Sequence, residues 1–114
     1  MARISTHVLD TSRGMPANDV PVSLERRQDS GGWQTLTSAR TDADGRCAQL
    51  LPEGGSLSAG VYRVTFDSAS YHAAQGVSGF YPLVHVTFTV REGQSHLHIP
   101  LLLSPYGYTT YRGS

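Results

Sequence analysis

Val84-His85-Val86-Thr87-Phe88-Thr89-Val90 alternates strictly, with apolar side chains at the even positions and polar side chains at the odd positions. A period of two places the apolar side chains on one face of a β-strand and the polar ones on the other. The segment therefore predicts a half-buried strand with one wet or functional face. Similar patterns predict further strands near residues 4–8, 20–24, 33–41 and 60–66.

Residues typical of turns separate these strands. They occur at 12–16, 29–32, 42–45 and 92–94, and the last of these predicts a short antiparallel connection. Because seven to eight short strands are indicated, the sequence predicts an all-β, antiparallel β-sandwich. We expect residues 1–114 to form a single domain, since a chain of this length leaves little room for a second.

One segment, at about residues 68–75, breaks the strand pattern. Ser68 can cap a helix start, the alanines at 69, 73 and 74 favour helix, and Gly76 suits the position just after a helix end. The sandwich is therefore expected to carry one short helix.

Charge and composition exclude two classes of partner. Only 16% of the residues are charged, and nine Lys and Arg balance nine Asp and Glu. Nucleic-acid binding depends on clustered basic residues, and attachment to an anionic membrane depends on a polybasic segment. No apolar stretch approaches the ~20 residues that a membrane-spanning helix needs. Neither nucleic acid nor membrane is expected as a partner.

The cysteine content and the first residues indicate a compartment. Cys47 is the only cysteine, so no intrachain disulfide can form, which suits a reducing environment. Residues 1–10 lack the basic region followed by an apolar stretch that is typical of a signal peptide. These observations predict a cytoplasmic protein.

Histidines occupy the polar face of two predicted strands. On a strand over 95–103, Leu97, Ile99, Leu101 and Leu103 form an apolar ladder, so His96 and His98 must point to the opposite face. His7 likewise lies opposite Ile4 and Val8. Taken alone, such residues are compatible with a solvated sheet surface.

Two chemical roles, metal binding and proton transfer, can be considered for these histidines. The His-x-His spacing could place two imidazoles on one metal ion, but a zinc site needs three or four ligands and no others are recognisable, so no metal is expected. Imidazole can also exchange protons near neutral pH and so activate a water molecule. Covalent catalysis has little support, because there is no Gly-x-Ser-x-Gly elbow and Cys47 has no histidine nearby in sequence.

The segment Asp42-Ala43-Asp44-Gly45-Arg46 has two interpretations. It is superficially similar to a calcium loop, with Glu53 at the closing position, but the glycine comes two places early and Arg46 stands where an oxygen ligand is needed. The alternative is a tight turn whose Asp side chains bond to its own backbone. Arg46 would then lie at a sheet edge, where it could meet an anionic ligand.

Three segments together resemble the 5-hydroxyisourate hydrolase family, the enzymatic branch of the transthyretin group. They are Ile4-Ser5-Thr6-His7-Val8-Leu9-Asp10-Thr11, Thr41-Asp42-Ala43-Asp44-Gly45-Arg46-Cys47 and residues 96–114, which finish with the family's signature, Tyr111-Arg112-Gly113-Ser114. The similarity covers essentially the whole chain. Leu97 departs from the family, where an aromatic residue often stands, but it faces away from His98.

The resemblance implies a set of site residues at the dimer–dimer interface of a homotetramer. His7, His98 and Arg46 map onto the family's catalytic positions, and His7, Arg46, Tyr111 and Ser114 onto its substrate-binding positions. Arg112 and His96 are expected to have supporting roles. Strand parity agrees with this in part, since it independently places His7 and His98 away from the core.

The implied activity is hydrolysis of 5-hydroxyisourate to 2-oxo-4-hydroxy-4-carboxy-5-ureidoimidazoline in urate degradation, with neither metal nor organic cofactor. The leading alternative is a non-catalytic carrier of the thyroid-hormone type, which would have a less polar channel without His7, Arg46 and His98. A structural or adhesive sandwich module is a second alternative, for which a signal peptide or flanking domains would be expected.

Overall fold

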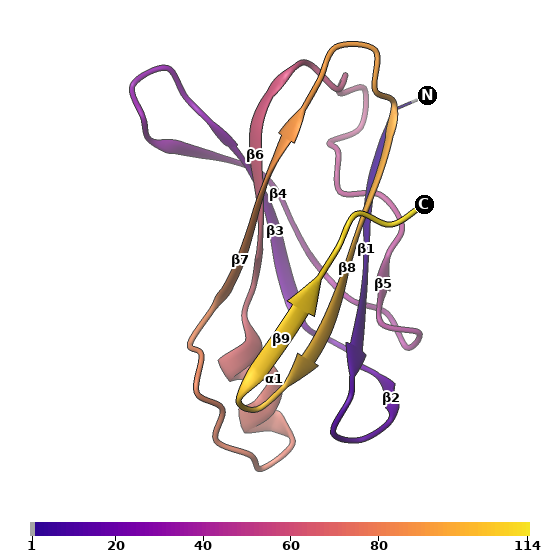
Figure 1. Ribbon diagram of the computed structural model, residues 1–114, viewed down its shortest axis with the longest axis vertical. Helices are drawn as coiled ribbons and strands as arrows, with labels where there is room; N and C mark the ends of the chain where they lie inside the picture. The colour runs from indigo at the N-terminus through magenta and orange to yellow at the C-terminus, as the bar shows by residue number, and fades with distance from the viewer. Residues whose placement is uncertain (1) are drawn as a thin grey trace.

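Two β-sheets face each other, and one short helix lies at one end of them (Figure 1). The computed structural model describes residues 2–114. Its elements are β1 (Arg3–Asp10), β2 (Met15–Pro16), β3 (Pro21–Arg27), β4 (Trp33–Arg40), β5 (Arg46–Cys47), β6 (Gly60–Phe66), α1 (Ser68–Ala74), β7 (Val84–Val90), β8 (His96–Ser104) and β9 (Gly107–Thr110). No helix within residues 2–114 is long and apolar enough to cross a membrane.

The first sheet has the strand order β2-β1-β8-β9, with β5 also paired to β1, and the second has the order β4-β3-β6-β7. The predicted all-β sandwich is confirmed, but residues 2–114 form nine strands rather than the predicted seven to eight, because β2 and β5 are strands of only two residues. One strand pair departs from the antiparallel pattern, because β1 and β8 run parallel. Parallel neighbours need a long crossover connection, and here the whole of the second sheet intervenes between them.

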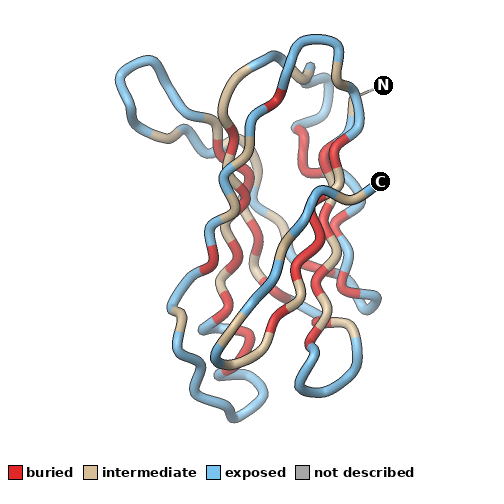
Figure 2. Tube along the Cα trace, in the orientation of Figure 1, coloured by how far each residue is buried: buried red, intermediate tan, exposed pale blue. Residues whose placement is uncertain are grey.

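The core lies between the two sheets, where the buried residues face one another (Figure 2). The predicted ladder of Leu97, Ile99, Leu101 and Leu103 is buried, whereas His98 of the same strand is half-buried and His96 exposed. Alternation in β1 is equally regular, with Ile4, Thr6, Val8 and Asp10 buried. One face of the first sheet is therefore left outside the core, as the parity of the sequence predicts.

Helix α1 matches the predicted range closely, but its capping residue differs from the prediction. The side chain of Asp67, not Ser68, caps the helix by accepting a hydrogen bond from the backbone N–H of Ser70. The Ser68 hydroxyl is buried and donates instead to the carbonyl oxygen of Tyr81 at 3.1 Å. Gly76 follows the helix end with a φ of 73°, as predicted.

The connection at residues 92–94 reverses the chain direction without joining neighbouring strands. β7 is an edge strand of the second sheet, whereas β8 belongs to the first. The turn therefore carries the chain across the sandwich (Figure 1), and β7 and β8 are not hydrogen-bonded neighbours. A local turn pattern shows that the chain reverses but not which sheet it enters.

Candidate active site

The outward face of the first sheet gathers polar side chains from distant parts of the chain. The parallel register of β1 and β8 places Ser5 beside His98 and Arg3 beside His96. On the other side of β1, β5 pairs antiparallel and sets Arg46 beside His7. Imidazoles from both ends of the chain and a guanidinium from its middle thus share one face.

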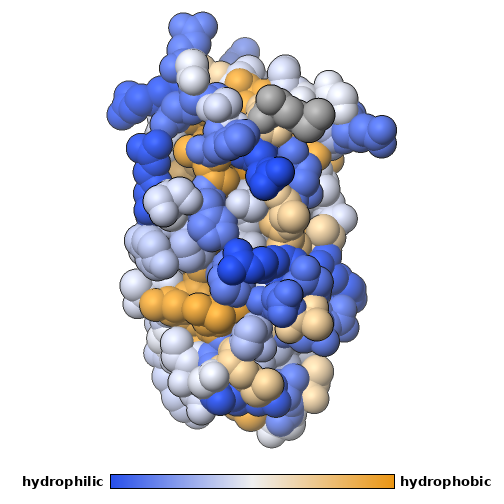
Figure 3. Space-filling model, turned by 90° about the vertical axis from the view of Figure 1, so that its right-hand side faces the viewer, coloured by the Kyte–Doolittle hydropathy of each residue, from blue (hydrophilic) through white to orange (hydrophobic). Residues whose placement is uncertain are grey.

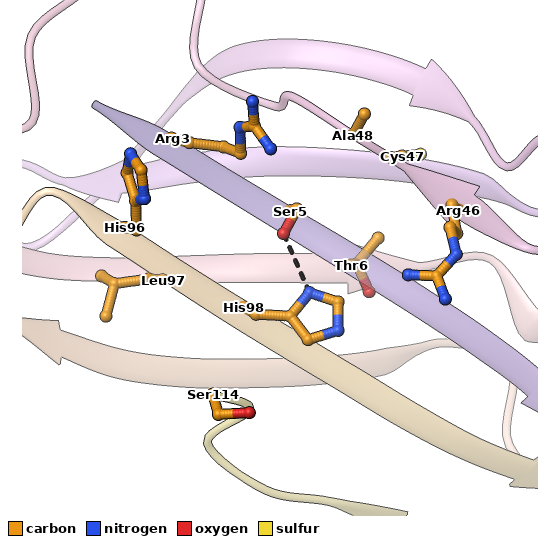
Figure 4. A pocket seen from close by; sticks show the side chains of 10 residues that line it. All are labelled: Arg3, Ser5, Thr6, Arg46, Cys47, Ala48, His96, Leu97, His98 and Ser114. Atoms are coloured by element: carbon orange, nitrogen blue, oxygen red, sulfur yellow. Dashed lines mark hydrogen bonds between the residues drawn. The ribbon is translucent and has the colours of Figure 1, made fainter. Parts of the chain in front are cut away.

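This face contains a pocket with a volume of about 420 Å³, within the range of small-molecule sites. Ten residues line it: Arg3, Ser5, Thr6, Arg46, Cys47, Ala48, His96, Leu97, His98 and Ser114 (Figure 4). Figure 3 looks at the side of the molecule where β1 and β5 lie and shows hydrophilic residues over much of it, with apolar patches between them. None of the lining residues is Asp or Glu, so the pocket is suited to an anion.

The imidazole of His98 is hydrogen-bonded to β1. Its Nδ1 lies 2.8 Å from the hydroxyl oxygen of Ser5. Partial burial lowers the pKa of His98, and the nearby charge of Arg46 and the His7 imidazole lower it further. Because all three effects disfavour the imidazolium form, the ring is held neutral near pH 7 and can accept a proton.

His7 lies at the edge of the pocket rather than among its lining residues. Its Nε2 is 2.9 Å from the carbonyl oxygen of Asp44. A carbonyl oxygen can only accept a hydrogen bond, so Nε2 carries the proton and donates it. In the neutral ring, the nitrogen with a free lone pair is therefore Nδ1.

The turn at residues 42–45 positions Arg46. One carboxylate oxygen of Asp42 accepts hydrogen bonds from the backbone N–H groups of Asp44 and Arg46, at 2.9 and 3.0 Å, which confirms the predicted turn. Gly45 has a φ of 77°, and a Cβ there would collide with the carbonyl oxygen of Val8. The turn therefore lies directly against β1, and Arg46 extends toward His98 (Figure 4).

The tail that follows β9 divides between two hollows. The backbone N–H of Gly113 donates to the carbonyl oxygen of His98 at 2.9 Å, and Ser114 lines the pocket. Tyr111 and Arg112 do not line it; they belong to a second hollow of about 310 Å³ on the side of β7. The chain thus brings together His98, Arg46, His96 and Ser114 in the pocket, with His7 beside it. Tyr111 and Arg112 line the second hollow, to which His98 and Leu97 also contribute.

Arg3, Ser5 and Gly113 are among the residues of this site that were not singled out from the sequence. Arg3 and Ser5 line the pocket, and their position on the same strand face as His7 was the signal that could have identified them. Gly113 contacts His98 through its backbone, which no side-chain pattern reveals. Across residues 2–114, no three side chains of His, Cys, Asp or Glu gather closely enough to hold a metal ion.

The chain is similar to known proteins over nearly its full length. A family model described as the HIUase/Transthyretin family matches residues 4–113. A relative from Salmonella dublin named 5-hydroxyisourate hydrolase is 43% identical over 111 residues, which cover 97% of this chain and 80% of the relative. The solved structure of Klebsiella pneumoniae 5-hydroxyisourate hydrolase is 37% identical, covers all of both chains and has a TM-score of 0.86. Sea bream transthyretin in complex with thyroxine is 36% identical, with 97% and 94% of the two chains covered and a TM-score of 0.90.

Proposed function

The chain belongs to the HIUase/transthyretin family, and from that membership and its cationic pocket we propose that it hydrolyses 5-hydroxyisourate to 2-oxo-4-hydroxy-4-carboxy-5-ureidoimidazoline. It is an enzyme of the 5-hydroxyisourate hydrolase type, acting in urate degradation. The observation that carries the proposal is a half-buried His98 with a lowered pKa, set beside Arg46 in a pocket lined by no Asp or Glu side chain.

His98, His7 and Arg46 each have a separate role in the proposed hydrolysis. His98 and His7 orient and deprotonate a water molecule, whose oxygen attacks the ring carbonyl. The carbon–nitrogen bond of the ring then breaks, the oxygen from water becomes part of the new carboxylate, and one imidazolium returns the proton to the leaving nitrogen. Arg46 holds the anionic heterocycle and offsets the charge that builds on the carbonyl oxygen.

The fold alone does not separate the enzyme from a thyroid-hormone carrier, because sea bream transthyretin with thyroxine has the same architecture. The residues that line the pocket favour the hydrolase over the carrier. Its guanidinium and imidazole groups suit a small polar anion that needs proton transfer, and the relative from Salmonella dublin is named as the hydrolase.

We further propose a cytoplasmic homotetramer in which a second subunit closes this face. Arg3, Arg46, His96 and Ser114 are exposed in the subunit, as are Tyr106 and Tyr111, at 75% and 57%. Aromatic residues and arginine are enriched at subunit interfaces. Tyr111 and Arg112 would then contribute to a site from the edge of the subunit contact.

Sedimentation equilibrium should give a mass four times that of the 12.3 kDa chain, and a monomer that is fully active would contradict the shared site.

The activity is tested by following the ultraviolet band of freshly generated 5-hydroxyisourate in a stopped-flow instrument. Wild-type protein is expected to accelerate its loss, whereas His98→Ala and His7→Ala should lower kcat by roughly 10²–10⁴-fold, the usual contribution of general acid–base catalysis. His85→Ala is the matched control, because His85 is an exposed histidine of β7 in the other sheet. A wild-type protein that leaves the spontaneous rate unchanged would refute the proposed function.

A further inference from the structure

The backbone of Gly113 lies against the imidazole ring of His98. A short antiparallel bridge joins the two residues, and the N–H of Gly113 donates to the His98 carbonyl oxygen at 2.9 Å. A Cβ at position 113 would lie 2.5 Å from Cδ2 of His98, 3.0 Å from Cγ and 3.1 Å from Cβ. Carbon atoms that are not bonded to each other prefer about 3.5–4.0 Å. Position 113 therefore has no room for any side chain while the ring keeps this orientation.

The opposite side of the ring is held by a hydrogen bond. The Ser5 hydroxyl engages Nδ1 of His98 at 2.8 Å, and the other ring nitrogen, Nε2, faces away from Ser5 on the side of Arg46 (Figure 4). The ring thus has a polar contact on β1 and a steric contact on the tail. Turning the ring toward the tail would require the tail to move, and turning it away would stretch the Ser5 hydrogen bond.

We propose that Gly113 is a positioning residue, whose bare backbone and the Ser5 hydroxyl together clamp the His98 imidazole with Nε2 directed into the pocket. The inference rests on the proposed function and extends it, because it assigns a role to a signature residue that has no side chain. Ser114 lines the pocket next to this contact. The backbone at residues 113–114 therefore fixes the position of both the His98 ring and Ser114.

The first test compares two alanine substitutions in the last part of the chain. Gly113→Ala is expected to lower kcat by roughly 10–100-fold with KM changed less than about twofold, because small displacements of a catalytic group carry penalties of that order. Gly107→Ala is the matched control: Gly107 lies on β9, and a Cβ there would meet only the Ser104 hydroxyl oxygen, at 3.7 Å. Equal kcat values for the two variants would overturn the proposal.

A double-mutant cycle separates positioning from a general loss of structure. If Gly113 acts through the ring, Gly113→Ala should cause no further loss of rate in a His98→Ala background. A full additional loss in that background would mean that Gly113 acts elsewhere, and the clamp would be wrong. Should Gly113→Ala lower the thermal midpoint below the assay temperature, Ser5→Ala tests the same clamp from its other side, and an unchanged kcat there would count against it.

A third measurement does not depend on turnover. Long-range ¹H–¹⁵N correlation spectra of the histidine rings should show the His98 resonances shifted in Gly113→Ala and unchanged in Gly107→Ala. Unshifted His98 resonances in Gly113→Ala would refute the clamp even in an active enzyme. Shifted resonances in a protein that does not hydrolyse 5-hydroxyisourate would support the clamp while refuting the proposed function, so the two failures are distinguishable.

Discussion

The hydroxyl oxygen of Ser5 lies 2.8 Å from Nδ1 of His98, although 93 positions of the sequence separate the two residues. The parallel pairing of β1 and β8 makes them direct neighbours in register. The hydrogen bond connects the first strand of the fold to the imidazole that we propose as a general base.

Replacing Ser5 by alanine should lower kcat by about 3–10-fold with little change in KM, because one hydrogen bond contributes about 1 kcal/mol. Ser5→Thr keeps the hydroxyl and should retain most of the rate. Ser30→Ala, in the exposed turn between β3 and β4, is the control. Steady-state kinetics in which Ser5→Ala equals wild type, or Ser5→Thr is as slow as Ser5→Ala, would contradict the assignment.

The pH dependence of the rate should follow the lowered pKa of His98. A base must be neutral to accept a proton, so activity is present above the folded-state pKa and lost as the pH falls through it. Because that pKa lies below the ordinary value of 6.5, the acid limb of kcat/KM should be centred below pH 6.5. A limb centred above 6.5 would argue against His98 as the base.

Removing the guanidinium beside His98 should raise the pKa of that imidazole toward its ordinary value. Arg46 is one of the charges that disfavour the imidazolium form, so in Arg46→Met the ring should protonate at higher pH than in wild type. An NMR titration of His98 measures this without relying on the rate. Arg27→Met, an exposed arginine at the end of β3, should leave the titration unchanged, and an equal shift in both variants would rule out the local effect.

Arg3 should contribute to substrate binding through its charge. It lines the pocket at the end opposite Arg46 (Figure 4), and no Asp or Glu side chain lines the pocket to neutralise it. Arg3→Gln is expected to raise KM about 3–10-fold while kcat stays close to wild type, with a smaller difference at 1 M salt, where exposed charges are screened. Steady-state kinetics at two ionic strengths check this. The matched variant Arg27→Gln should behave as wild type, and a lower kcat with unchanged KM in Arg3→Gln would contradict a binding role.

Glu25, on β3 of the second sheet, should determine how the free energy of unfolding changes at acid pH. Glu25 is only 8% exposed and accepts hydrogen bonds from Arg63 and Thr65, while the Arg63 guanidinium lies 4.3 Å from the centre of the Trp33 ring. Burial acts to raise the pKa of Glu25, but the hydrogen bonds from Arg63 and Thr65 and the charges of Arg63 and His85 outweigh it and lower the pKa below 4.5. The stabilisation is therefore present above about pH 4.5 and is lost as the pH falls through the lowered value.

Glu25→Gln should lower the free energy of unfolding at pH 7 by about 2–4 kcal/mol, since it leaves a partly buried Arg63 without its anion, and this difference should shrink below pH 4.5. Arg40→Gln breaks the exposed ion pair with Asp19, whose side chains are 61% and 68% exposed, and should cost less than about 0.5 kcal/mol. Urea unfolding at both pH values provides the comparison. If the two variants lose equal unfolding free energy at pH 7, the proposed role of Glu25 would be contradicted. It would also be contradicted if the difference between Glu25→Gln and wild type grows below pH 4.5.

The alternation of residues along each strand was enough to predict which side chains leave the core. Leu97 and Ile99 are buried and His98 faces outward because a strand alternates its side chains with a period of two, a property of local backbone geometry. The helix near residues 68–75 and the turn at 42–45 were predicted for the same kind of reason. The helix propensity of alanine, the hydrogen bonds of an Asp side chain and the backbone freedom of glycine all act locally in the chain.

The pairing of the strands, in contrast, could not be predicted from local patterns. The parallel pairing of β1 and β8, which places Ser5 against His98, depends on how two whole sheets bury their faces, and no local pattern encodes a contact across 93 positions. The same applies to Tyr111, which lies in a second hollow because the tail passes along the β7 side, and to Gly113, whose contact with His98 is made by the backbone. The alternation of side chains along a strand is a local property and can be predicted residue by residue. Which strands become neighbours depends instead on how the two complete sheets bury their apolar faces against each other.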